Sequence, residues 1–176
     1  IASNSNMGDN GYSVGTVYWF KYEPVKWTVI TTDENFGLAA IIPELVLDCG
    51  NFDSLNGWFV ENFAPVAFDQ RVSEVFGSDL YEFVNTLPLS VATDKNYGYD
   101  ADPKRQDEKR VKSGTDYAKA LGLFVNGKTA ASSWIIGDKS EKITVVQSDG
   151  SITEKDADDA DCGIVPVLLI KLKTDK

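Results

Sequence analysis

The longest apolar run of the chain lies near its C-terminal end and predicts a central β-strand. Residues 163–172 read GIVPVLLIKL and are rich in β-branched side chains. A run of this length without polar alternation is typical of a strand that is covered on both faces of a sheet. Pro166 lacks the backbone N–H that a strand ladder uses, so we expect a bulge or a ladder break beside it.

Shorter apolar and alternating stretches predict three strands in the N-terminal third. Residues 14–22 are rich in aromatic side chains, residues 25–30 alternate apolar and polar, and residues 38–47 are apolar with an interruption at Pro43. The polar residues 33–37 between the last two are typical of a turn. Sequential strands with short connections predict a meander.

Helical spacing appears in three places. Residues 54–63 begin with a good N-cap, Ser54, and place Leu55, Trp58, Phe59 and Phe63 on one stripe. Residues 69–76 predict a second short helix and residues 115–122 a third, with Thr115 as N-cap and Gly122 just past its end. Trp58 could act as a platform for a sugar ring, but its place on the stripe favours a core position.

The remaining segments predict strands and loops. Residues 131–136 and 142–146 are expected to be strands, and the turn at residues 148–150 joins the second to residues 151–153 in a hairpin. The acidic residues 154–161 then lead into the final strand. The overall expectation is an α+β fold with a central antiparallel or mixed sheet, two or three short helices and long loops.

Length and charge restrict the organisation and the partners. The chain has 176 residues, 43% of them hydrophobic, which suits a single domain over residues 14–176 after a flexible segment of residues 1–13. The formal net charge is −10, which disfavours binding to nucleic acid or to anionic membrane surfaces. No apolar run approaches the roughly 20 residues of a membrane span, so none is expected.

The polar, irregular residues 93–114 are the best candidate for a functional surface. Long loops in a domain of this size are more often functional or disordered than simple connections. The candidate ligand-binding residues in this loop are Tyr97, Tyr99, Asp100, Asp102 and Arg105. Aromatic faces beside hydrogen-bonding groups suit a sugar or a protein surface. Alternatively, the two tyrosines hold an otherwise mobile loop against the body of the domain.

The residues available for catalysis are few. The sequence contains no histidine, which excludes a histidine-dependent triad and a histidine-ligated zinc site. A glycoside hydrolase needs only two carboxylates, but no pair stands out among the 27 acidic residues. We therefore assign no catalytic residue and no cofactor.

The acidic cluster Asp156, Asp158, Asp159 and Asp161 could bind calcium through its oxygens, but it lacks the order of an EF-hand loop. A solvated acidic loop is the simpler interpretation, so no metal site is assigned. Cys49 and Cys162 match no metal or redox spacing. They could form a disulfide, or they could be two separate buried thiols, and both alternatives stay open.

Several local patterns in order resemble a family of bacterial domains catalogued as a domain of unknown function, common in Firmicutes and other gut bacteria. The matching segments are residues 25–30, 45–49, 54–63, 67–68, 116–122, 133–134, 148–150 and 163–172. The resemblance implies a C-type-lectin-like fold, related to that of formylglycine-generating enzymes, in which the N- and C-terminal strands lie close together. It also implies a secreted or surface-attached protein, and hence an extracellular or cell-surface location.

This chain departs from the family at three positions where its members usually carry arginine: Asn56, Ile136 and Val165. Interior arginines need anionic partners, so their joint loss suggests that an internal polar network became apolar. The cysteines also do not match the reactive pair of the formylglycine-generating relatives. A shared fold does not imply a shared activity.

These observations favour a non-enzymatic, secreted or surface-displayed binding module that recognises a glycan or a protein through residues 93–114. The alternative is a structural spacer in a larger surface protein, derived from an enzyme-like fold. A carboxylate-based hydrolase is the third hypothesis. The sequence does not indicate the oligomeric state.

Overall fold

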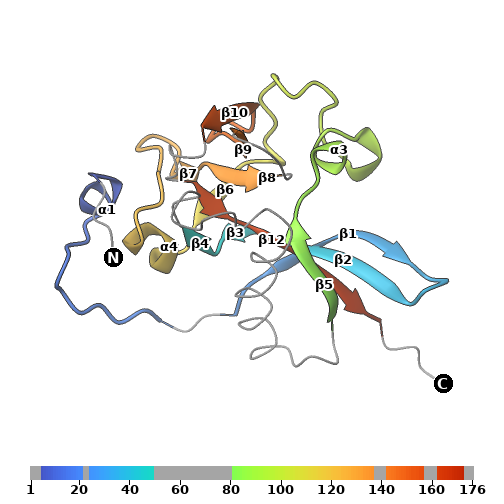
Figure 1. Ribbon diagram of the computed structural model, residues 1–176, viewed down its shortest axis with the longest axis horizontal. Coiled ribbons are helices and arrows are strands. Elements are labelled where there is room, and N and C mark those ends of the chain that lie inside the picture. Colours follow the sequence, from blue (N-terminus) through green and yellow to red (C-terminus); the bar gives the residue numbers. More distant parts are fainter. Residues whose placement is uncertain (1–4, 22–23, 50–80, 137–141, 157–161, 173–176) are drawn as a thin grey trace.

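The structure is a computed structural model that describes residues 5–21, 24–49, 81–136, 142–156 and 162–172. Over these residues the chain forms three small β-sheets and a few short helices, so the predicted α+β class is confirmed (Figure 1). No helix among them is long and apolar enough to cross a membrane. The predicted helices at residues 54–63 and 69–76, with Asn56 and Trp58, lie outside the described residues.

The final apolar run is central to the first sheet, as predicted. In spatial order its strands are β1 (Trp27–Asp33), β2 (Leu38–Pro43), β12 (Pro166–Lys171) and β5 (Tyr81–Thr86). Each neighbouring pair is antiparallel. Leu168 in β12 is fully buried and belongs with Ile41 of β2 to one apolar cluster. Two neighbours and apolar packing explain why this stretch carries so few polar residues.

The ladder break expected beside Pro166 is also confirmed. Strand β11 (Gly163–Ile164) belongs to the second sheet, whereas β12 begins at Pro166 in the first sheet. Val165, between them, belongs to neither strand and is fully buried. Because proline cannot donate to a ladder, the chain leaves one sheet and enters the next at this point.

The second sheet contains both parallel and antiparallel pairs. In spatial order its strands are β10 (Ile152–Asp156), β9 (Lys142–Val146), β8 (Trp134–Ile136), β11 and β4 (Asp48–Cys49). Strands β8 and β11 are parallel, and the other pairs are antiparallel. The predicted hairpin is present as β9 and β10, with Gly150 in its turn at a φ of 83°.

The third sheet connects the other two. Its strands are β3 (Leu45–Val46), β6 (Lys112–Gly114) and β7 (Ala131–Ser132). The predicted strand at residues 131–136 is therefore split at Ser133, with β7 in the third sheet and β8 in the second. The predicted strand at residues 38–47 is divided in the same way after Pro43. The chain thus passes from one sheet to another within two apolar stretches, after Pro43 and at Ser133.

The main core lies where the second and third sheets meet α4 (Asp116–Ala120). Trp134 is almost fully buried at its centre, packed with side chains such as Val46, Leu123 and Val146. The start of α4 is as predicted, because the Thr115 side chain accepts a hydrogen bond from the Ala118 amide at 3.1 Å. Gly122, with φ of 100°, follows its last turn, as predicted for that residue.

The predicted strand at residues 14–22 is wrong, because residues 14–21 have no regular secondary structure. The Tyr18 and Phe20 rings contact Tyr12, and Phe20 also contacts Tyr117 of α4. These two side chains therefore pack against other rings while the backbone joins no sheet, and Trp19 between them is 94% exposed. The predicted meander is reduced to the β1–β2 hairpin, and β2 lies between the first described strand and β12.

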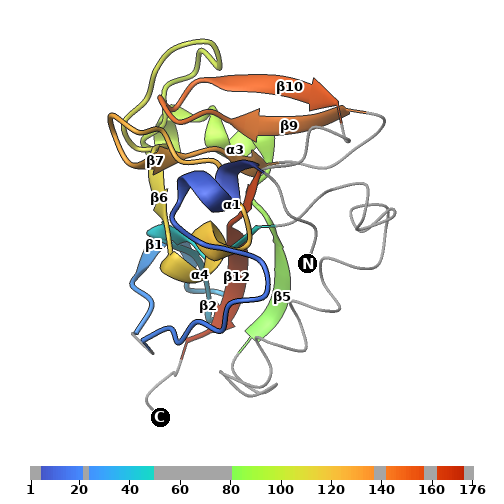
Figure 2. The ribbon, with the colours of Figure 1, turned by 90° about the vertical axis from the view of Figure 1, so that its left-hand side faces the viewer.

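The segment before residue 14 contains helix α1 (Ser5–Asp9), which lies beside α4 (Figure 2). The Asn10 side-chain amide donates to the Lys119 carbonyl at 3.0 Å and to the Leu123 carbonyl at 2.9 Å. These two bonds attach the N-terminal segment to the body of the domain. The division of the chain into residues 1–13 and 14–176 stays a prediction.

Candidate functional site

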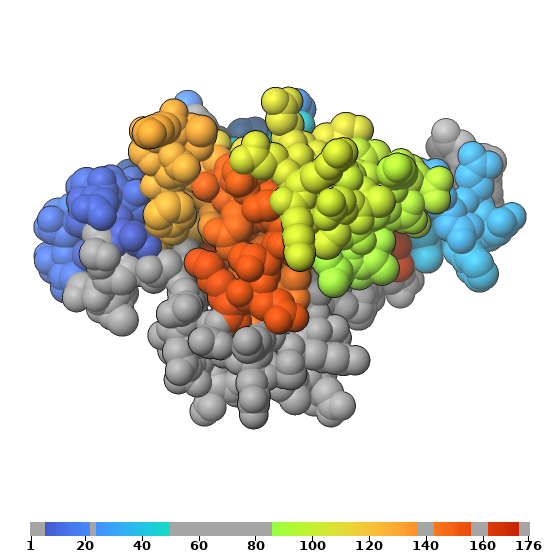
Figure 3. Space-filling view, turned by 90° about the horizontal axis from the view of Figure 1, so that it is seen from above, coloured from blue at the N-terminus to red at the C-terminus, as the bar shows by residue number. Residues whose placement is uncertain are grey.

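Residues 93–114, the predicted functional loop, lie beside the β9–β10 hairpin on one face of the molecule (Figure 3). The loop begins after α3 (Leu89–Ala92), includes the short 3-10 helix η1 (Lys95–Tyr97) and ends in β6. The Ile152 amide donates to the Pro103 carbonyl at 2.7 Å, which joins the loop to β10. The loop is therefore attached to the second sheet along its length rather than only at its ends.

The carboxylates of the loop form its turns. Asp94, Asp100, Asp102 and Asp107 each accept a hydrogen bond from the amide two residues later, at 2.8 to 2.9 Å. The second oxygen of Asp107 also accepts from the Asp100 amide at 2.8 Å. Such short-range side-chain bonds replace regular secondary structure in irregular segments. The acidic residues of this loop thus have a structural role that explains their number.

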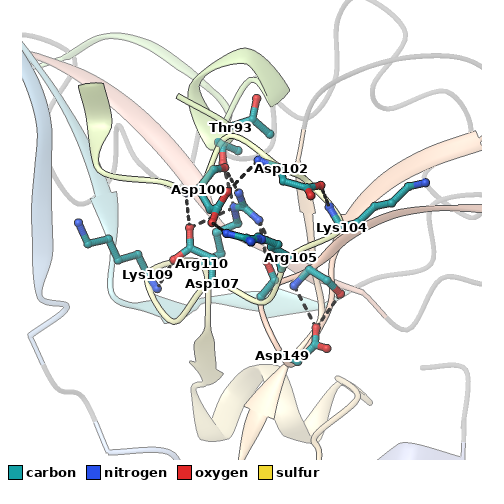
Figure 4. A network of polar contacts seen from close by, with 12 residues as sticks. Thr93, Asp100, Asp102, Lys104, Arg105, Asp107, Lys109, Arg110 and Asp149 are labelled. Atoms are coloured by element: carbon teal, nitrogen blue, oxygen red, sulfur yellow. Dashed lines mark hydrogen bonds and ion pairs between the residues drawn. The ribbon is translucent and has the colours of Figure 1, made fainter. Parts of the chain in front are cut away.

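Arg110 lies at the centre of the network of polar contacts that holds the loop together (Figure 4). Its side chain is completely buried, and its Nε lies 3.5 Å from an oxygen of Asp107. The guanidinium donates to the carbonyl oxygens of Ala92, Asp100, Arg105 and Gly150. A buried cation is stable only when its donors are satisfied, and carbonyls from α3, the loop and the hairpin turn do this here.

Arg110 also connects the loop to the main core, because its carbonyl accepts a hydrogen bond from Trp134 Nε1 at 2.9 Å. Arg110 is not among the residues predicted from the sequence to form the site. It is one of four basic residues between positions 104 and 110, and nothing in that run indicates which of them is buried.

The five predicted ligand-binding residues divide into two groups. Tyr99 packs against the main core cluster, and burial followed by the nearby Asp107 charge raises its pKa. It holds the loop against the body, as the alternative interpretation expected. Asp100 and Asp102 accept the turn hydrogen bonds described above, and both also lie at the surface of the loop. Hydrogen bonding from the Asp102 amide is the main reason why the pKa of Asp100 is lowered.

Arg105 and Tyr97 are exposed, as is Asp102. The Arg105 side chain is 72% exposed and forms a 3.6 Å ion pair with Asp100. Tyr97 is 39% exposed, at the end of η1, where Gly98 adopts the left-handed conformation that ends this turn. The structure therefore leaves these two side chains available for recognition.

Tyr97 lies at an apolar pocket of about 210 Å³. Its lining includes Leu87 and Val91 around α3, and Ile30, Val167 and Leu169 on the first sheet. These three sheet residues are half-buried, so apolar surface remains open beside the tyrosine. An apolar concavity next to a polar loop has the general character of a ligand site.

Lys112, at the end of the loop, is a second buried cation. Its Nζ donates to the Pro43 carbonyl at 2.6 Å and lies 5.6 Å from the centre of the Trp134 ring. Burial lowers its pKa to about 8, and the charge of Glu44 opposes this shift. The amine joins β6 to the end of β2, so its observed role is structural.

Burial of Lys112 predicts a specific pH dependence of stability. Below pH 8 the lysine is protonated in both the folded and the unfolded chain. Between pH 8 and about 10.5 only the unfolded chain keeps the proton, so the free energy of unfolding gains a contribution that rises with pH. The gain is on the order of 3 kcal/mol across this window. Urea unfolding at pH 7.5 and 10 should show this rise relative to Lys112→Met, and parallel pH profiles of the two proteins would contradict it.

The two cysteines lie close in the second sheet but belong to different clusters. Cys49 is opposite Gly163 in the β4–β11 ladder and packs in the main core. Cys162 precedes Gly163 and packs with Ile135, Ile143 and Val145. Both side chains are buried, Cys49 in the main core and Cys162 in the smaller cluster. The disulfide between them stays a prediction.

No group of three or more cysteine, aspartate or glutamate side chains suited to a metal ion occurs in the residues that the structure describes. Residues 157–161 of the predicted acidic loop lie outside them. Among the residues that the structure describes, two carboxyl groups have a shifted pKa, those of Asp100 and Asp149, and both shift downward, mainly through hydrogen bonds they accept. A general acid for glycoside hydrolysis needs the opposite shift.

The chain was compared with protein families, curated proteins and solved structures. No family model, no curated protein and no solved structure matches the chain.

Proposed function

We propose that this chain is a non-enzymatic binding module that recognises a protein or a glycan through Tyr97 and the loop of residues 93–114. The observation that carries this proposal is the loop built on Arg110, which holds Tyr97 at the rim of the apolar pocket. A loop fixed before binding loses little conformational entropy when a partner binds. The apolar lining favours a protein ligand that inserts an apolar side chain.

The polar surface beside the pocket supports the same proposal. Arg105 and Asp100 form an exposed ion pair, and such pairs at the rim of an interface contribute more to specificity than to affinity. An aromatic anchor with a polar rim is the usual arrangement of a protein interaction site. We further propose that the module is secreted or displayed at the cell surface and has a C-type-lectin-like fold, on the resemblance of the sequence alone.

A second candidate function, a structural spacer, is favoured by one observation. Ile136 and Val165, at two positions where the resembling family carries arginine, are fully buried in the main core cluster. If relatives bind a ligand through an internal polar network, this chain has apolar packing at those positions. In that case the surface around Tyr97 would be without a ligand.

A comparison of two aromatic substitutions distinguishes these functions. We expect Tyr97→Ala to weaken partner binding by about 30-fold, which corresponds to roughly 2 kcal/mol for a central aromatic residue. Phe36→Ala is the matched control, because Phe36 is 77% exposed and does not line the pocket. Deletion of the whole loop would be a poor test, since it would also remove Arg110 and Lys112.

The measurement is selection against a phage-displayed peptide library and a glycan array with the wild-type chain and both variants. Ligands that are lost with Tyr97→Ala and retained with Phe36→Ala support the binding module. Absence of any ligand for the wild type, or equal binding by Tyr97→Ala, contradicts the proposal and favours the spacer.

A further inference from the structure

A second pocket, of about 230 Å³, lies between the N-terminal segment and α4, away from the loop of residues 93–114. One wall comes from residues 12–20 and the other from residues 117–121, more than ninety positions later in the sequence. The Asn10 amide holds the first wall against the second through its two bonds to carbonyls at the end of α4. The pocket is therefore formed by contacts already present in the unliganded chain.

The walls of this pocket are unusually aromatic. Tyr12 and Tyr18 form an edge-to-face pair with centroids 5.0 Å apart, and Phe20 and Tyr117 form another at 5.7 Å. Tyr18, Phe20 and Tyr117 are each more than a third exposed, whereas Tyr12 is half-buried. Three partly exposed rings at one concave surface exceed what attachment of a short segment requires.

Hydroxyl groups accompany these rings. Ser13, Thr16 and three tyrosines contribute hydroxyls to the residues that line the pocket. Tyr18 Oη accepts a hydrogen bond from the Ser13 amide at 3.0 Å, so its own proton remains available to donate. Burial, followed by the nearby Asp116 charge, raises the pKa of Tyr12, so this phenol stays protonated and can also donate.

The charge of the site indicates the class of ligand. None of the described residues that line the pocket carries a charged side chain, and the chain as a whole has a formal net charge of −10. An anionic ligand would find no cation in the lining and a repulsive overall field. A neutral ring with one apolar C–H face and several hydroxyls at its edge matches both the aromatic faces and the hydroxyl groups.

We propose that this pocket binds a neutral pyranose sugar, stacked on the exposed ring of Phe20, with the perpendicular ring of Tyr117 beside it, and hydrogen-bonded by the surrounding hydroxyls. This site is distinct from the surface around Tyr97. A chain with both sites could hold a glycan at one surface and a protein at the other.

The test is an NMR titration of the full chain with the methyl glycosides of glucose, galactose, mannose and N-acetylglucosamine at millimolar concentrations. We expect at least one of these sugars to shift the amide signals of residues 12–20 and 117–121 in a saturable manner. Glucuronic acid, an anionic sugar of similar shape, is expected to bind more weakly. Absence of saturable shifts with all four neutral sugars, or stronger binding of glucuronic acid, would overturn the proposal.

Two variants test whether the sugar binds in this pocket. Phe20→Ala should weaken the sugar about tenfold by removing one stacking ring. Asn10→Asp keeps the size of the side chain but loses the donors that hold the N-terminal segment, so it should also weaken the sugar without unfolding the core. Tyr97→Ala should bind the sugar as the wild type does. Sugar binding that is unaffected by Phe20→Ala and by Asn10→Asp, or that is lost with Tyr97→Ala, would place the ligand elsewhere.

Discussion

Arg110→Met is expected to lower the free energy of unfolding by about 3–5 kcal/mol, the usual cost of removing one partner from a buried ion pair. The substitution would leave the Asp107 carboxylate without its buried cation and four carbonyl oxygens without a donor. The length of the methionine side chain retains most of the packing. The loss would therefore come mainly from the unsatisfied polar groups.

Arg105→Met in the same loop is the matched control for this prediction. Its side chain is 72% exposed and its ion pair with Asp100 is at the surface, so a loss of no more than about 1 kcal/mol is expected. Urea unfolding of both variants and the wild type, followed by circular dichroism, measures the difference. Equal losses for the two substitutions would show that Arg110 does not organise the loop.

Gly150→Ala is the second substitution with a large expected effect. Gly150 has a φ of 83° in the β9–β10 turn, where an L side chain is strained by roughly 1–2 kcal/mol. An added Cβ would also collide with the backbone carbonyl of Asp107. Overpacking of this kind costs about 1–3 kcal/mol, so we expect a total loss of about 2–5 kcal/mol.

Gly11→Ala separates the two contributions to that loss. Gly11 has a similar φ of 86°, and nothing lies within 4 Å of the position its Cβ would occupy. This control should show only the conformational strain. Thermal unfolding of the two variants gives the comparison, and a loss at Gly150 no larger than at Gly11 would contradict the close contact between hairpin and loop.

The elements that sequence patterns predict well here are those set by local chemistry. The apolar run around Leu168 predicts a central strand because such a run must be covered on both faces, and Pro166 predicts the break because proline has no N–H. The Thr115 cap depends on a side-chain hydroxyl that accepts a hydrogen bond, whereas Gly122 and Gly150 adopt positive φ angles that favour glycine. Each of these predictions needs no information about distant parts of the chain.

The elements that were predicted wrongly or not at all depend on contacts between residues far apart in the sequence. Residues 14–22 have a strand-like composition, but Tyr18 and Phe20 pack near α4 and the backbone finds no neighbouring strand. Strand β5 and helix α3 were not predicted, although β5 is a direct neighbour of β12. The position of β5 follows from its pairing with β12, which lies some eighty residues later in the chain.

Only part of the candidate site could be predicted, because it too depends on contacts between residues far apart in the sequence. The loop of residues 93–114 was recognised from its polarity and length, and Tyr97 is exposed at a pocket as a binding residue requires. The carboxylates proposed as ligand groups serve as turn formers, which their spacing in sequence did not indicate. Arg110, the residue that fixes the loop, could not be chosen among neighbouring basic residues without the structure.

Hydrogen exchange of the backbone amides between Tyr99 and Arg110 tests most directly whether the loop is a fixed platform for Tyr97. The amides of Tyr99, Asp100 and Arg110 donate to the Asp94 carbonyl, the Asp107 carboxylate and the Asp107 carbonyl. We predict that all three amides are protected from exchange in the wild type. Arg110→Met should remove this protection, while the backbone amide of Trp134 in the core stays protected. Exchange of the wild-type loop at the rate of an unstructured peptide would contradict the proposal that this loop presents a preformed binding surface.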